Sequence, residues 1–563
     1  MDYISPANFF EVIMKIIILN EDRYQYDIHS LFKAFYPSED VKLLIINEND
    51  RDKDSLAEIS SAKHLDIHDI ENATYIDFYE ESMDSCIKGY VRIKAKTAKN
   101  GFENFFDENV KCTLTLSGDI LSAKMDYADI VSGSFENKST DGENRELDTS
   151  KNAIKKLIYI VLSELTGKKL PWGNLTGIRP TRIAMNLIDK GKSDAEVKEY
   201  MKNTYFVSDN KADLSCRIAR REKRILSDID YENGYSLYIG IPFCPTTCLY
   251  CSFTSYPIGA YKNIVDDYIT CLEKEIEYVA DNFKGRTLDT IYVGGGTPTT
   301  LEPDQIRRLL GFLSQKLDIS RVKEFTVESG RPDSITGEKL KAMKEMGVDR
   351  ISVNPQTMRD ETLRLIGRRH TVQQLKDSFL MAREQGFDNI NMDIILGLPG
   401  ETAEDVAYTM EEIKKLRPDD LTVHSLAIKR GSRLAEVLHE KELRGELKVS
   451  VIESINNTAE MMDIAAKGAE DMGLSPYYLY RQKNISGNFE NTGYAAEGKA
   501  GIYNILINEE VQSIVALGAG TVTKRVYGDG RIERCDNVKD VSLYMQQLDQ
   551  MIDRKRELFL QNV

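Results

Sequence analysis

From residue 235 onward, short apolar runs alternate with longer segments whose apolar residues recur at helical spacing. The short runs predict strands and the longer segments predict helices, because side chains on one face repeat about every two residues in a strand and about every 3.6 in a helix. Six strands alternating with helices favour a parallel sheet with right-handed crossovers. The expected strands are Leu237–Ile241, Leu288–Val293, Val322–Val327, Arg350–Val353, Asn389–Ile395 and Asp420–Leu426, and the expected helices are Ile264–Asn282, Asp304–Leu317, Ser334–Met346, Val372–Gln385 and Glu404–Leu416.

The conspicuous glycine-rich and polar residues follow the carboxyl ends of these strands. Barrel-like α/β enzymes place their chemistry at that end of their strands. The pattern therefore predicts an α/β fold class, with a partial (β/α)6 TIM-like barrel over residues 234–430. The strand-end features are Cys244–Cys251, Gly294–Thr297, Glu328, Asn354–Gln356 and Gly397–Gly400.

Residues 1–150 predict a separate N-terminal α+β domain, in which strand-like apolar or alternating runs surround one helical segment. Residues 133–150 are rich in turn-forming and polar residues, which is typical of a linker. No catalytic constellation accompanies the histidines of this region, so no role is predicted for the domain. Strands are expected at Lys15–Leu19, Val41–Ile46, Gly89–Lys96 and Val110–Ser117, and a helix is expected at His29–Tyr36.

Two further regions flank the predicted barrel. Residues 151–233 predict a helical connecting region that begins with a helix at Asn152–Thr166 and holds the only tryptophan, Trp172. Residues 431–563 predict a mostly helical region that covers the substrate.

Composition narrows the classes of partner. The 563 residues carry a net charge of −16, so we expect no nucleic-acid partner. The most apolar early run is too short to span a bilayer, so no membrane association is expected. Because most of the eight cysteines are scattered and no signal peptide is evident, we expect a cytoplasmic protein.

Cys244, Cys248 and Cys251 are the exception to this scatter, at spacings of four and three residues. Three thiolates from one loop can hold three corners of a cubane iron–sulfur cluster and leave its fourth iron open. The alternatives are a zinc site, which needs a fourth ligand that does not follow at finger spacing, and a disulfide, which needs an oxidising compartment.

This Cys-x-x-x-Cys-x-x-Cys motif, with Tyr250 before the last cysteine, resembles the signature of the radical S-adenosylmethionine (SAM) superfamily. The lead-in from Tyr238 to Cys244 is similar to the oxygen-independent coproporphyrinogen III dehydrogenase family, and the segments Pro171–Arg182 and Tyr477–Asn491 resemble its HemZ-like members. The resemblance implies the partial barrel, a [4Fe-4S] cluster and S-adenosyl-L-methionine. It also implies that one electron from the cluster cleaves SAM to a 5'-deoxyadenosyl radical.

The same resemblance implies the contacts to SAM. Arg368 is expected to pair with the SAM carboxylate, with Arg369 as the competing choice, and Asp393 is expected to bind the ribose hydroxyls. The glycine-rich turn is expected to approach the methionyl amino group through its backbone. The implied SAM contacts are Tyr238, Tyr250, Gly295, Gly296, Thr297, Glu328, Gln356, Arg368 and Asp393.

The family's reaction is oxidative decarboxylation of two coproporphyrinogen III propionates to vinyl groups, giving protoporphyrinogen IX in haem biosynthesis. It requires a tetrapyrrole substrate and a reducing electron donor of the flavodoxin or ferredoxin type. Arg481 and Lys483 are candidate propionate ligands, although a solvated basic rim is an equally typical explanation for them. Arg179 and Arg182 could also reach substrate carboxylates, but an exposed arginine is usually only solvated.

Two alternatives stay open at this point: a haem-binding chaperone of the HemW type, for which His370 and His424 are available as ligands, and radical methylation or ring opening of haem. Phe253 stands where well-studied dehydrogenases have an additional cysteine, so the resemblance leaves a second bound SAM undecided.

Overall fold

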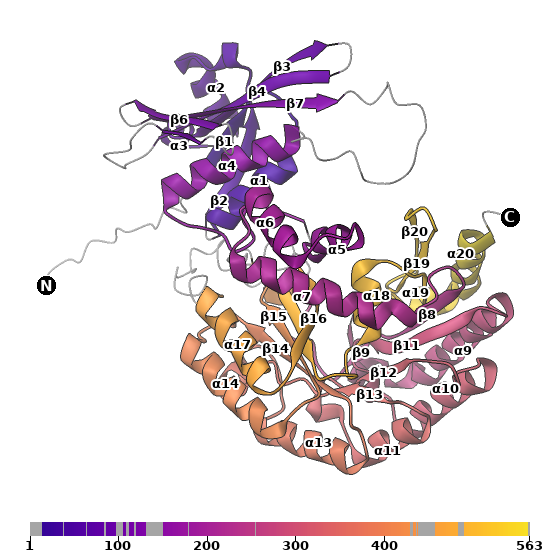
Figure 1. The fold of residues 1–563 in the computed structure, drawn as a ribbon. Coiled ribbons are helices and arrows are strands. Elements are labelled where there is room, and N and C mark those ends of the chain that lie inside the picture. Colours follow the sequence, from indigo (N-terminus) through magenta and orange to yellow (C-terminus); the bar gives the residue numbers. More distant parts are fainter. Residues whose placement is uncertain are drawn as a thin grey trace, which may run out of the picture. The chain divides into compact units, whose positions relative to one another are not determined.

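The computed structural model describes residues 14–560 except 38, 64, 84–85, 97–104, 108–111, 118–119, 131–149, 178, 254, 428–431, 435, 437–456 and 482–488. The chain divides into two compact units (Figure 1). The first comprises residues 1–178, 193–213 and 486–489, and the second comprises residues 179–192, 214–485 and 490–563. Among the described helices, none has the length and apolarity that crossing a membrane requires.

The first unit is built on a seven-stranded mixed sheet of order β2-β1-β3-β4-β7-β6-β5. β1 pairs in parallel with β2 and β3, and the remaining pairs are antiparallel. The strands are β1 Met14–Leu19, β2 Asp40–Ile45, β3 Thr74–Met83, β4 Cys86–Lys96, β5 Phe105–Asp107, β6 Cys112–Ser117 and β7 Ile120–Ile130.

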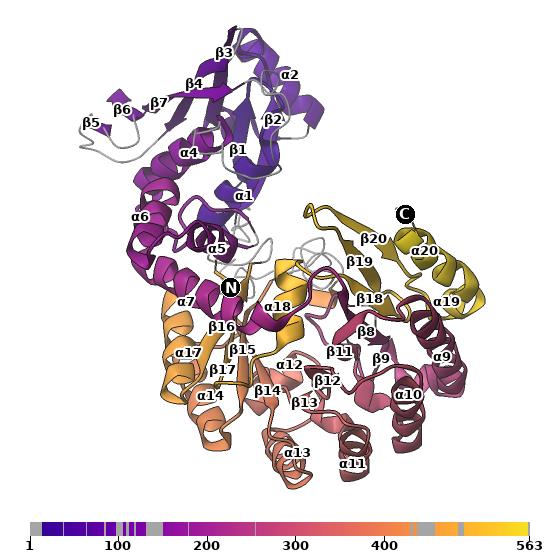
Figure 2. The ribbon, with the colours of Figure 1, turned by 45° about the vertical axis from the view of Figure 1, so that its right-hand side comes forward.

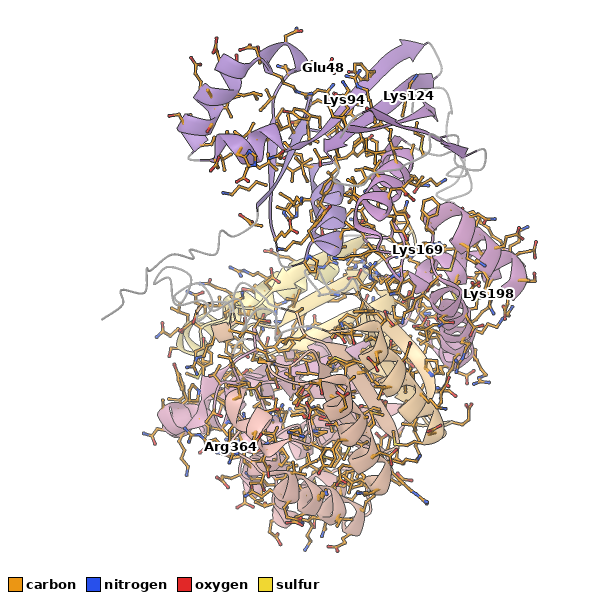
Figure 3. The ribbon with its side chains drawn as sticks, turned by 90° about the vertical axis from the view of Figure 1, so that its left-hand side faces the viewer. Glu48, Lys94, Lys124, Lys169, Lys198 and Arg364 are labelled. Carbon is orange, nitrogen blue, oxygen red and sulfur yellow. The ribbon has the colours of Figure 1, made fainter. Side chains whose placement is uncertain are left out.

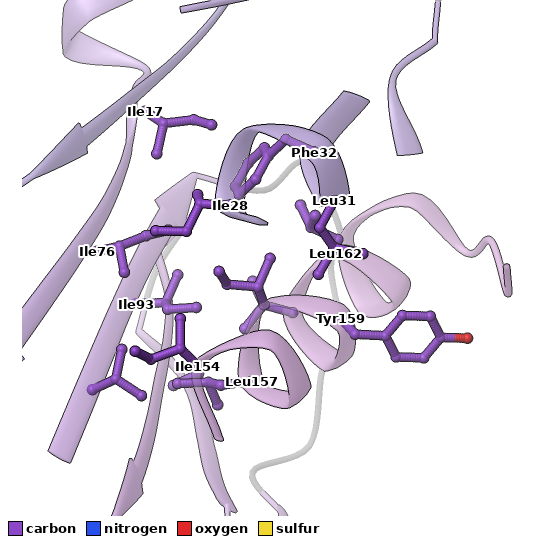
Figure 4. Close-up of a cluster of buried hydrophobic side chains, with 14 of the residues drawn as sticks. Ile17, Ile28, Leu31, Phe32, Ile76, Ile93, Ile154, Leu157, Tyr159 and Leu162 are labelled. Carbon is purple, nitrogen blue, oxygen red and sulfur yellow. The ribbon is translucent and has the colours of Figure 1, made fainter. Parts of the chain in front are cut away.

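Both faces of β1 are buried, which explains its uninterrupted apolar sequence. Ile17 lies in a core with helices α1 (Gln25–Phe35) and α4 (Ser150–Thr166), as Figure 4 shows. Ile16 and Ile18 point to the opposite face and pack in a second cluster with residues of α2 (Lys53–Lys63) and α3 (Ile67–Glu71). The predicted α+β character of this segment is therefore confirmed. The predicted linker over residues 133–150 lies almost entirely outside the described residues.

Trp172, which follows α4, is fully buried. Gly173 has a positive φ of +54°, and a Cβ atom there would lie 1.9 Å from the carbonyl oxygen of Tyr205. Only glycine fits this close approach. Helices α5 (Thr181–Asp189), α6 (Asp194–Tyr205) and α7 (Asp209–Ile225) follow, as the sequence predicts.

The second unit contains the predicted barrel. Six neighbouring parallel strands form the centre of an eleven-stranded sheet, and the intervening helices cover its convex side (Figure 2). The predicted strands and helices are confirmed to within a few residues. The strands are β8 Gly234–Ile241, β11 Thr287–Gly295, β12 Glu324–Glu328, β13 Arg350–Ser352, β14 Ile390–Leu396 and β15 Asp420–Ser425, and the helices are α9 Val265–Asn282, α10 Pro303–Lys316, α11 Gly337–Glu345, α13 Val372–Glu384 and α14 Ala403–Leu416.

The C-terminal part of the chain adds strands to both edges of this sheet as well as helices. β17 and β16 continue the sheet beyond β15, while β18, β19 and β20 continue it beyond β8. The strands are β16 Ser475–Tyr480, β17 Asn491–Ala495, β18 Ile514–Leu517, β19 Val522–Val526 and β20 Ile532–Asp536, and the helices are α17 Ala459–Asp471, α18 Ile502–Glu509, α19 Val541–Gln546 and α20 Leu548–Leu560.

Helix α18 lies on the concave side of the sheet, where it contacts β11 and β16 (Figure 2). The buried Glu324 carboxylate at the start of β12 accepts hydrogen bonds from the backbone amides of Ile502 and Tyr503, the latter at 3.3 Å. A negative charge at a helix N-terminus is stabilising, because the first amides have no partner within the helix. This contact fixes α18 against the amino end of the barrel.

A buried ion pair fixes the C-terminal helices. Lys555 on α20 lies 2.6 Å from Glu275 on α9, and both side chains are fully buried. The Glu275 carboxylate also accepts hydrogen bonds from the Tyr544 hydroxyl at 2.5 Å and the Gly518 amide at 2.7 Å. The loop after β18 is thereby held beside the barrel strands.

Candidate functional site

The cysteine-bearing loop follows β8 directly. It contains the short strand β9 (Phe243–Cys244) and returns through β10 (Tyr256–Pro257). Two backbone hydrogen bonds join it to the glycine-rich turn after β11: Gly296 donates to Ile241 and Thr297 donates to Phe243, both at 2.7 Å. A Cβ atom on Gly296 would lie 2.6 Å from the Phe243 oxygen, so glycine is required for this approach.

Cys244, Cys248 and Cys251 all line one cavity of about 250 Å³ at the carboxyl ends of the strands. None of the three forms a disulfide. Burial is the main reason that the pKa of Cys244 is raised to about 11. The structure thus brings together the three thiols that the sequence singled out.

Arg331, in the turn after β12, holds this loop in place. Its guanidinium donates to the Thr246 carbonyl oxygen at 3.1 Å, the Thr246 hydroxyl at 3.0 Å and the Cys248 sulfur at 3.4 Å. The Asp333 carboxylate accepts its two remaining donors at 2.9 and 2.8 Å. Only 4% of Arg331 is exposed, so a permanent positive charge is fixed beside the sulfur of a candidate cluster ligand.

Glu328, at the end of β12, also lines the cavity. Its carboxylate accepts a hydrogen bond from the Tyr292 hydroxyl at 2.6 Å. Burial raises the pKa of Glu328 to about 7, and the hydrogen bond from Tyr292 opposes that increase without cancelling it. The side chain therefore carries a proton for part of the time near neutral pH.

The ends of β13 and β14 present a connected polar group. The Asn354 amide donates to one Asp393 oxygen at 2.6 Å, and the Asn391 amide donates to the other at 2.7 Å. Gln356 adopts a left-handed conformation with φ of +65°, and its backbone amide donates to the Asp393 carbonyl at 2.9 Å. These contacts position the Asp393 carboxylate and the Gln356 amide side chain in the lining of the cavity that also contains the cysteines.

Arg368 lies between the cysteine loop and these strand ends. It donates to the Gly330 carbonyl at 2.8 Å and to the Tyr250 hydroxyl at 3.1 Å. Its Nε atom is buried and has no hydrogen-bond partner among the described residues. Since buried donors in proteins are normally satisfied, this atom suits an acceptor on a bound ligand. Arg369, the competing choice, is exposed and is not part of the cavity lining.

The predicted SAM contacts divide between two cavities. Tyr238 lines only the second cavity, which measures about 690 Å³ and lies against the concave face of the sheet. The other predicted SAM contacts line the first cavity together with the cysteines; they are Tyr250, Gly295, Gly296, Thr297, Glu328, Gln356, Arg368 and Asp393.

The second cavity has a largely aromatic wall. Tyr238, Tyr292 and Tyr503 stack in a group with ring centroids 4.5 to 6.1 Å apart. Tyr478 and Tyr480 stack on each other at 6.2 Å. Residues that line both cavities, and so join them, are Phe253, Gly295, Glu328, Asp393, His424 and Tyr480.

The cations of the second cavity already have acidic partners. Arg350, which is 2% exposed, pairs with the buried Asp420 at 2.6 Å, and Lys524 pairs with Glu510 at 2.9 Å. Buried donors with no partner in the described part of the chain are nevertheless present at the base of this cavity, on Arg350 Nε and Ser352 Oγ.

The substrate candidates are placed less favourably. Arg481 is 7% exposed and lies outside the described lining of both cavities, and burial lowers its pKa to about 10. Lys483 lies outside the described residues. Arg179 pairs with Glu510 at 2.8 Å, and Arg182 contributes to neither lining. Propionate binding by Arg481 and Lys483 stays a prediction.

Sequence reasoning missed Arg331, Tyr292 and Tyr503 as parts of the site. Arg331 follows Glu328 by three residues in the same strand-end turn. The clustering of polar residues at strand ends could therefore have predicted that Arg331 belongs to the site. Tyr292 lies inside a strand and Tyr503 comes from α18, far along the chain. Their approach depends on tertiary packing that periodicity does not report.

We expect replacement of Arg331 by methionine to make an iron–sulfur cluster on the three cysteines harder to reduce. The substitution removes the positive charge beside Cys248, and charges and hydrogen bonds near ligand sulfurs tune cluster potentials. The expected decrease in midpoint potential is on the order of 59 mV, a tenfold change for one electron. The measurement is a redox titration followed by electron paramagnetic resonance (EPR). Arg331→Lys, which keeps the charge, should shift less; a methionine variant with the wild-type potential would contradict the assignment.

We expect Glu328→Gln to stabilise the cofactor-free protein at pH 8 but hardly at pH 5. Because folding raises the pKa of Glu328, its contribution to the free energy of unfolding is fully present below a pH of about 4.5. That contribution is lost as the pH rises through about 7 and the buried carboxyl ionises. Glutamine keeps an acceptor for Tyr292 and never ionises. The midpoint of thermal unfolding at several pH values measures the effect, with the 81%-exposed Glu361 replaced by glutamine as control. A Glu328→Gln difference that is constant with pH would refute the buried-acid explanation.

Comparisons with known proteins place the chain in a family. A family model described as "Radical SAM superfamily" matches residues 238–413. The oxygen-independent coproporphyrinogen-III oxidase-like protein HemZ of Bacillus subtilis is 38% identical over 410 residues, which are 72% of this chain and 80% of that protein. The heme chaperone HemW of Bacillus subtilis is 36% identical over 245 residues, which are 43% of this chain and 62% of that protein.

The oxygen-independent coproporphyrinogen III oxidase of Salmonella typhimurium is 27% identical over 328 residues, which are 57% of this chain and 66% of that protein. The superfamily's cofactors are a [4Fe-4S] cluster and SAM, and the predicted resemblance is confirmed. The chain belongs to the radical SAM superfamily and, within it, to the family of the coproporphyrinogen-III oxidase-like protein HemZ.

Proposed function

We propose that this protein catalyses the oxygen-independent oxidative decarboxylation of coproporphyrinogen III to protoporphyrinogen IX. The observation that carries the proposal is the joining of two cavities: the cavity lined by the three cysteines shares six lining residues with a larger aromatic cavity inside the barrel. Groups bound in the two cavities would therefore lie next to each other. The name of the HemZ relative supports the same reaction class.

The residues of the first cavity fit the family's cofactors. Cys244, Cys248 and Cys251 would hold three irons of the cluster and leave the fourth for SAM. Arg368, whose Nε has no hydrogen-bond partner in the described part of the chain, is suited to the SAM carboxylate, and Asp393 is suited to the ribose hydroxyls. When bound, the cluster and SAM supply one-electron chemistry at a carbon–hydrogen bond.

The protein's own contribution is to bind, orient and exclude water. Tyr238, Tyr292 and Tyr503 form an apolar wall against which the pyrrole rings of a macrocycle can pack. Helix α18 carries Tyr503 and Asn504 into this wall, so the cavity is bounded on the side of the amino ends of the strands. Fixed positioning of substrate against a reactive atom is a large source of rate enhancement.

A heme chaperone function is the second candidate, because one contact favours it. His424 Nδ1 lies 3.4 Å from the Tyr480 hydroxyl, and both residues line the larger cavity. Histidine and tyrosine are both established ligands of haem iron. The 36% identity to HemW over part of the chain agrees with this alternative.

We expect the reconstituted, reduced protein to convert coproporphyrinogen III to protoporphyrinogen IX under anaerobic conditions, with about two deoxyadenosines formed per molecule because each decarboxylated propionate needs one radical. Each of Cys244→Ala, Cys248→Ala and Cys251→Ala should lose the cluster absorbance and all turnover. Chromatography of deoxyadenosine and of oxidised porphyrins measures both products.

Cys271→Ala is the matched control, since Cys271 lies on α9 and outside the lining of both cavities. It should retain cluster and activity. Deoxyadenosine formation without protoporphyrin would contradict the proposed substrate. Tight haem binding with an intact cluster and no deoxyadenosine would favour the chaperone.

A further inference from the structure

A buried lysine lies behind the two strand-end turns that contact the cysteine loop. Lys339, on α11, is 9% exposed, whereas lysines are usually exposed, as Lys169 is (labelled in Figure 3). Burial lowers the pKa of Lys339, and the exposed Glu302 opposes this decrease without cancelling it. Among the described residues, no carboxylate forms an ion pair with its ammonium. Because a buried charge is costly, the contacts of Lys339 call for an explanation.

The Lys339 ammonium donates to one backbone carbonyl in each of the two turns. The Thr299 oxygen, in η4 (Pro298–Thr300) after β11, accepts at 2.7 Å. The Ser334 oxygen, in η5 (Pro332–Ser334) after β12, accepts at 3.3 Å. The hydroxyls of Thr299 and Ser334 also bond each other at 2.7 Å. Lys339 therefore joins the turn after β11 to the turn after β12.

Each of these turns contacts a different cysteine. In the turn after β11, the Thr297 hydroxyl lies 3.4 Å from the Cys244 sulfur. In the turn after β12, the Arg331 guanidinium donates to the Cys248 sulfur at 3.4 Å. Lys339 is not part of the cavity lining, yet it connects the residues that support two of the three predicted cluster ligands.

The position of Lys339 in its helix gives the ammonium a rigid base. Lys339 lies in the first turn of α11, where its backbone amide donates to the N-cap hydroxyl of Thr336 at 3.3 Å. Its neighbours Leu340 and Met343 are fully buried, and α11 packs beside α10 and α13. Hydrogen bonds from a charged donor are stronger than those from a neutral one. The two turns are therefore fastened to a packed helix as well as to each other.

We propose that Lys339 is a positioning residue for the iron–sulfur cluster and that it acts through Arg331. The Ser334 hydroxyl donates to the Arg331 carbonyl at 2.8 Å, so the turn that Lys339 holds also fixes the backbone of Arg331. The positive guanidinium is thereby kept beside the Cys248 sulfur, where charges and hydrogen bonds tune the cluster potential. The proposal needs a cluster on the three cysteines and does not depend on which substrate the protein takes.

The test is a redox titration of the reconstituted protein followed by EPR. We expect Lys339→Met to decrease the equilibrium constant for reduction of the cluster about threefold, which is about 28 mV at 59 mV per tenfold change. Ser334→Ala removes two hydroxyl contacts without changing any charge and should shift the potential in the same direction. Because Lys339 acts through Arg331, Lys339→Met should add no further shift to a protein that already carries Arg331→Met.

Lys341→Met is the matched control, since it removes the same charge from an exposed position on the same helix. It should keep the wild-type potential. Additive shifts in the double variant, an equal shift in the control, or a Lys339→Met protein that loses thermal stability at the wild-type potential would overturn the proposal. If Lys339→Met does not fold, an unshifted Ser334→Ala protein overturns it. The expected shifts without any porphyrin product would refute only the proposed substrate, and a wild-type protein that binds no cluster would refute both.

Discussion

The parallel register of β8 and β11 is the constraint on which the site depends. Because Ile241 pairs with Gly295, the cysteine loop and the glycine-rich turn leave the sheet at the same edge. Two backbone hydrogen bonds then join the loop and the turn, and a side chain on Gly296 would break this contact. Parallel strands place all their carboxyl ends together, so Glu328, Gln356 and Asp393 reach the same cavity from later strands. One topological rule therefore assembles residues separated by about 150 positions.

The buried ion pairs mainly hold the strand-end turns and the strands below them in one geometry. Arg331 uses all of its donors on Asp333, Thr246 and Cys248, and Arg350 is held by Asp420 at the other end of the barrel. Removing one partner of such a pair leaves an uncompensated buried charge, which is strongly destabilising, although the intact pair itself adds little net stability. These pairs thus specify one geometry for the turns that carry the site and for the strands below it.

The sequence allowed the barrel strands, their helices and the three cysteines to be predicted, since each rests on a local signal: periodicity for Val322–Val327, spacing for Cys244 to Cys251. It did not predict that Arg331 bonds Cys248 or that α18 enters the concave side, because those contacts join segments distant along the chain. The short strands β16 to β20 at the sheet edges were also not predicted. Their strand conformation depends on the neighbouring strands they pair with more than on their own pattern of apolar and polar residues. The burial of Arg481, which lies outside the described lining of both cavities, was also not predictable from its identity.

The assignment of Cys244, Cys248 and Cys251 as the only protein ligands of a four-iron cluster is tested most directly by the EPR spectrum of the reduced, reconstituted protein before and after SAM is added. A cluster held by only three cysteines has one iron open to SAM, so we expect a four-iron signal whose g values shift when SAM binds. A four-iron signal that is identical with and without SAM would show that the fourth iron is already ligated. That result would contradict the assembly of both cofactors in the cavity lined by Cys244, Cys248 and Cys251.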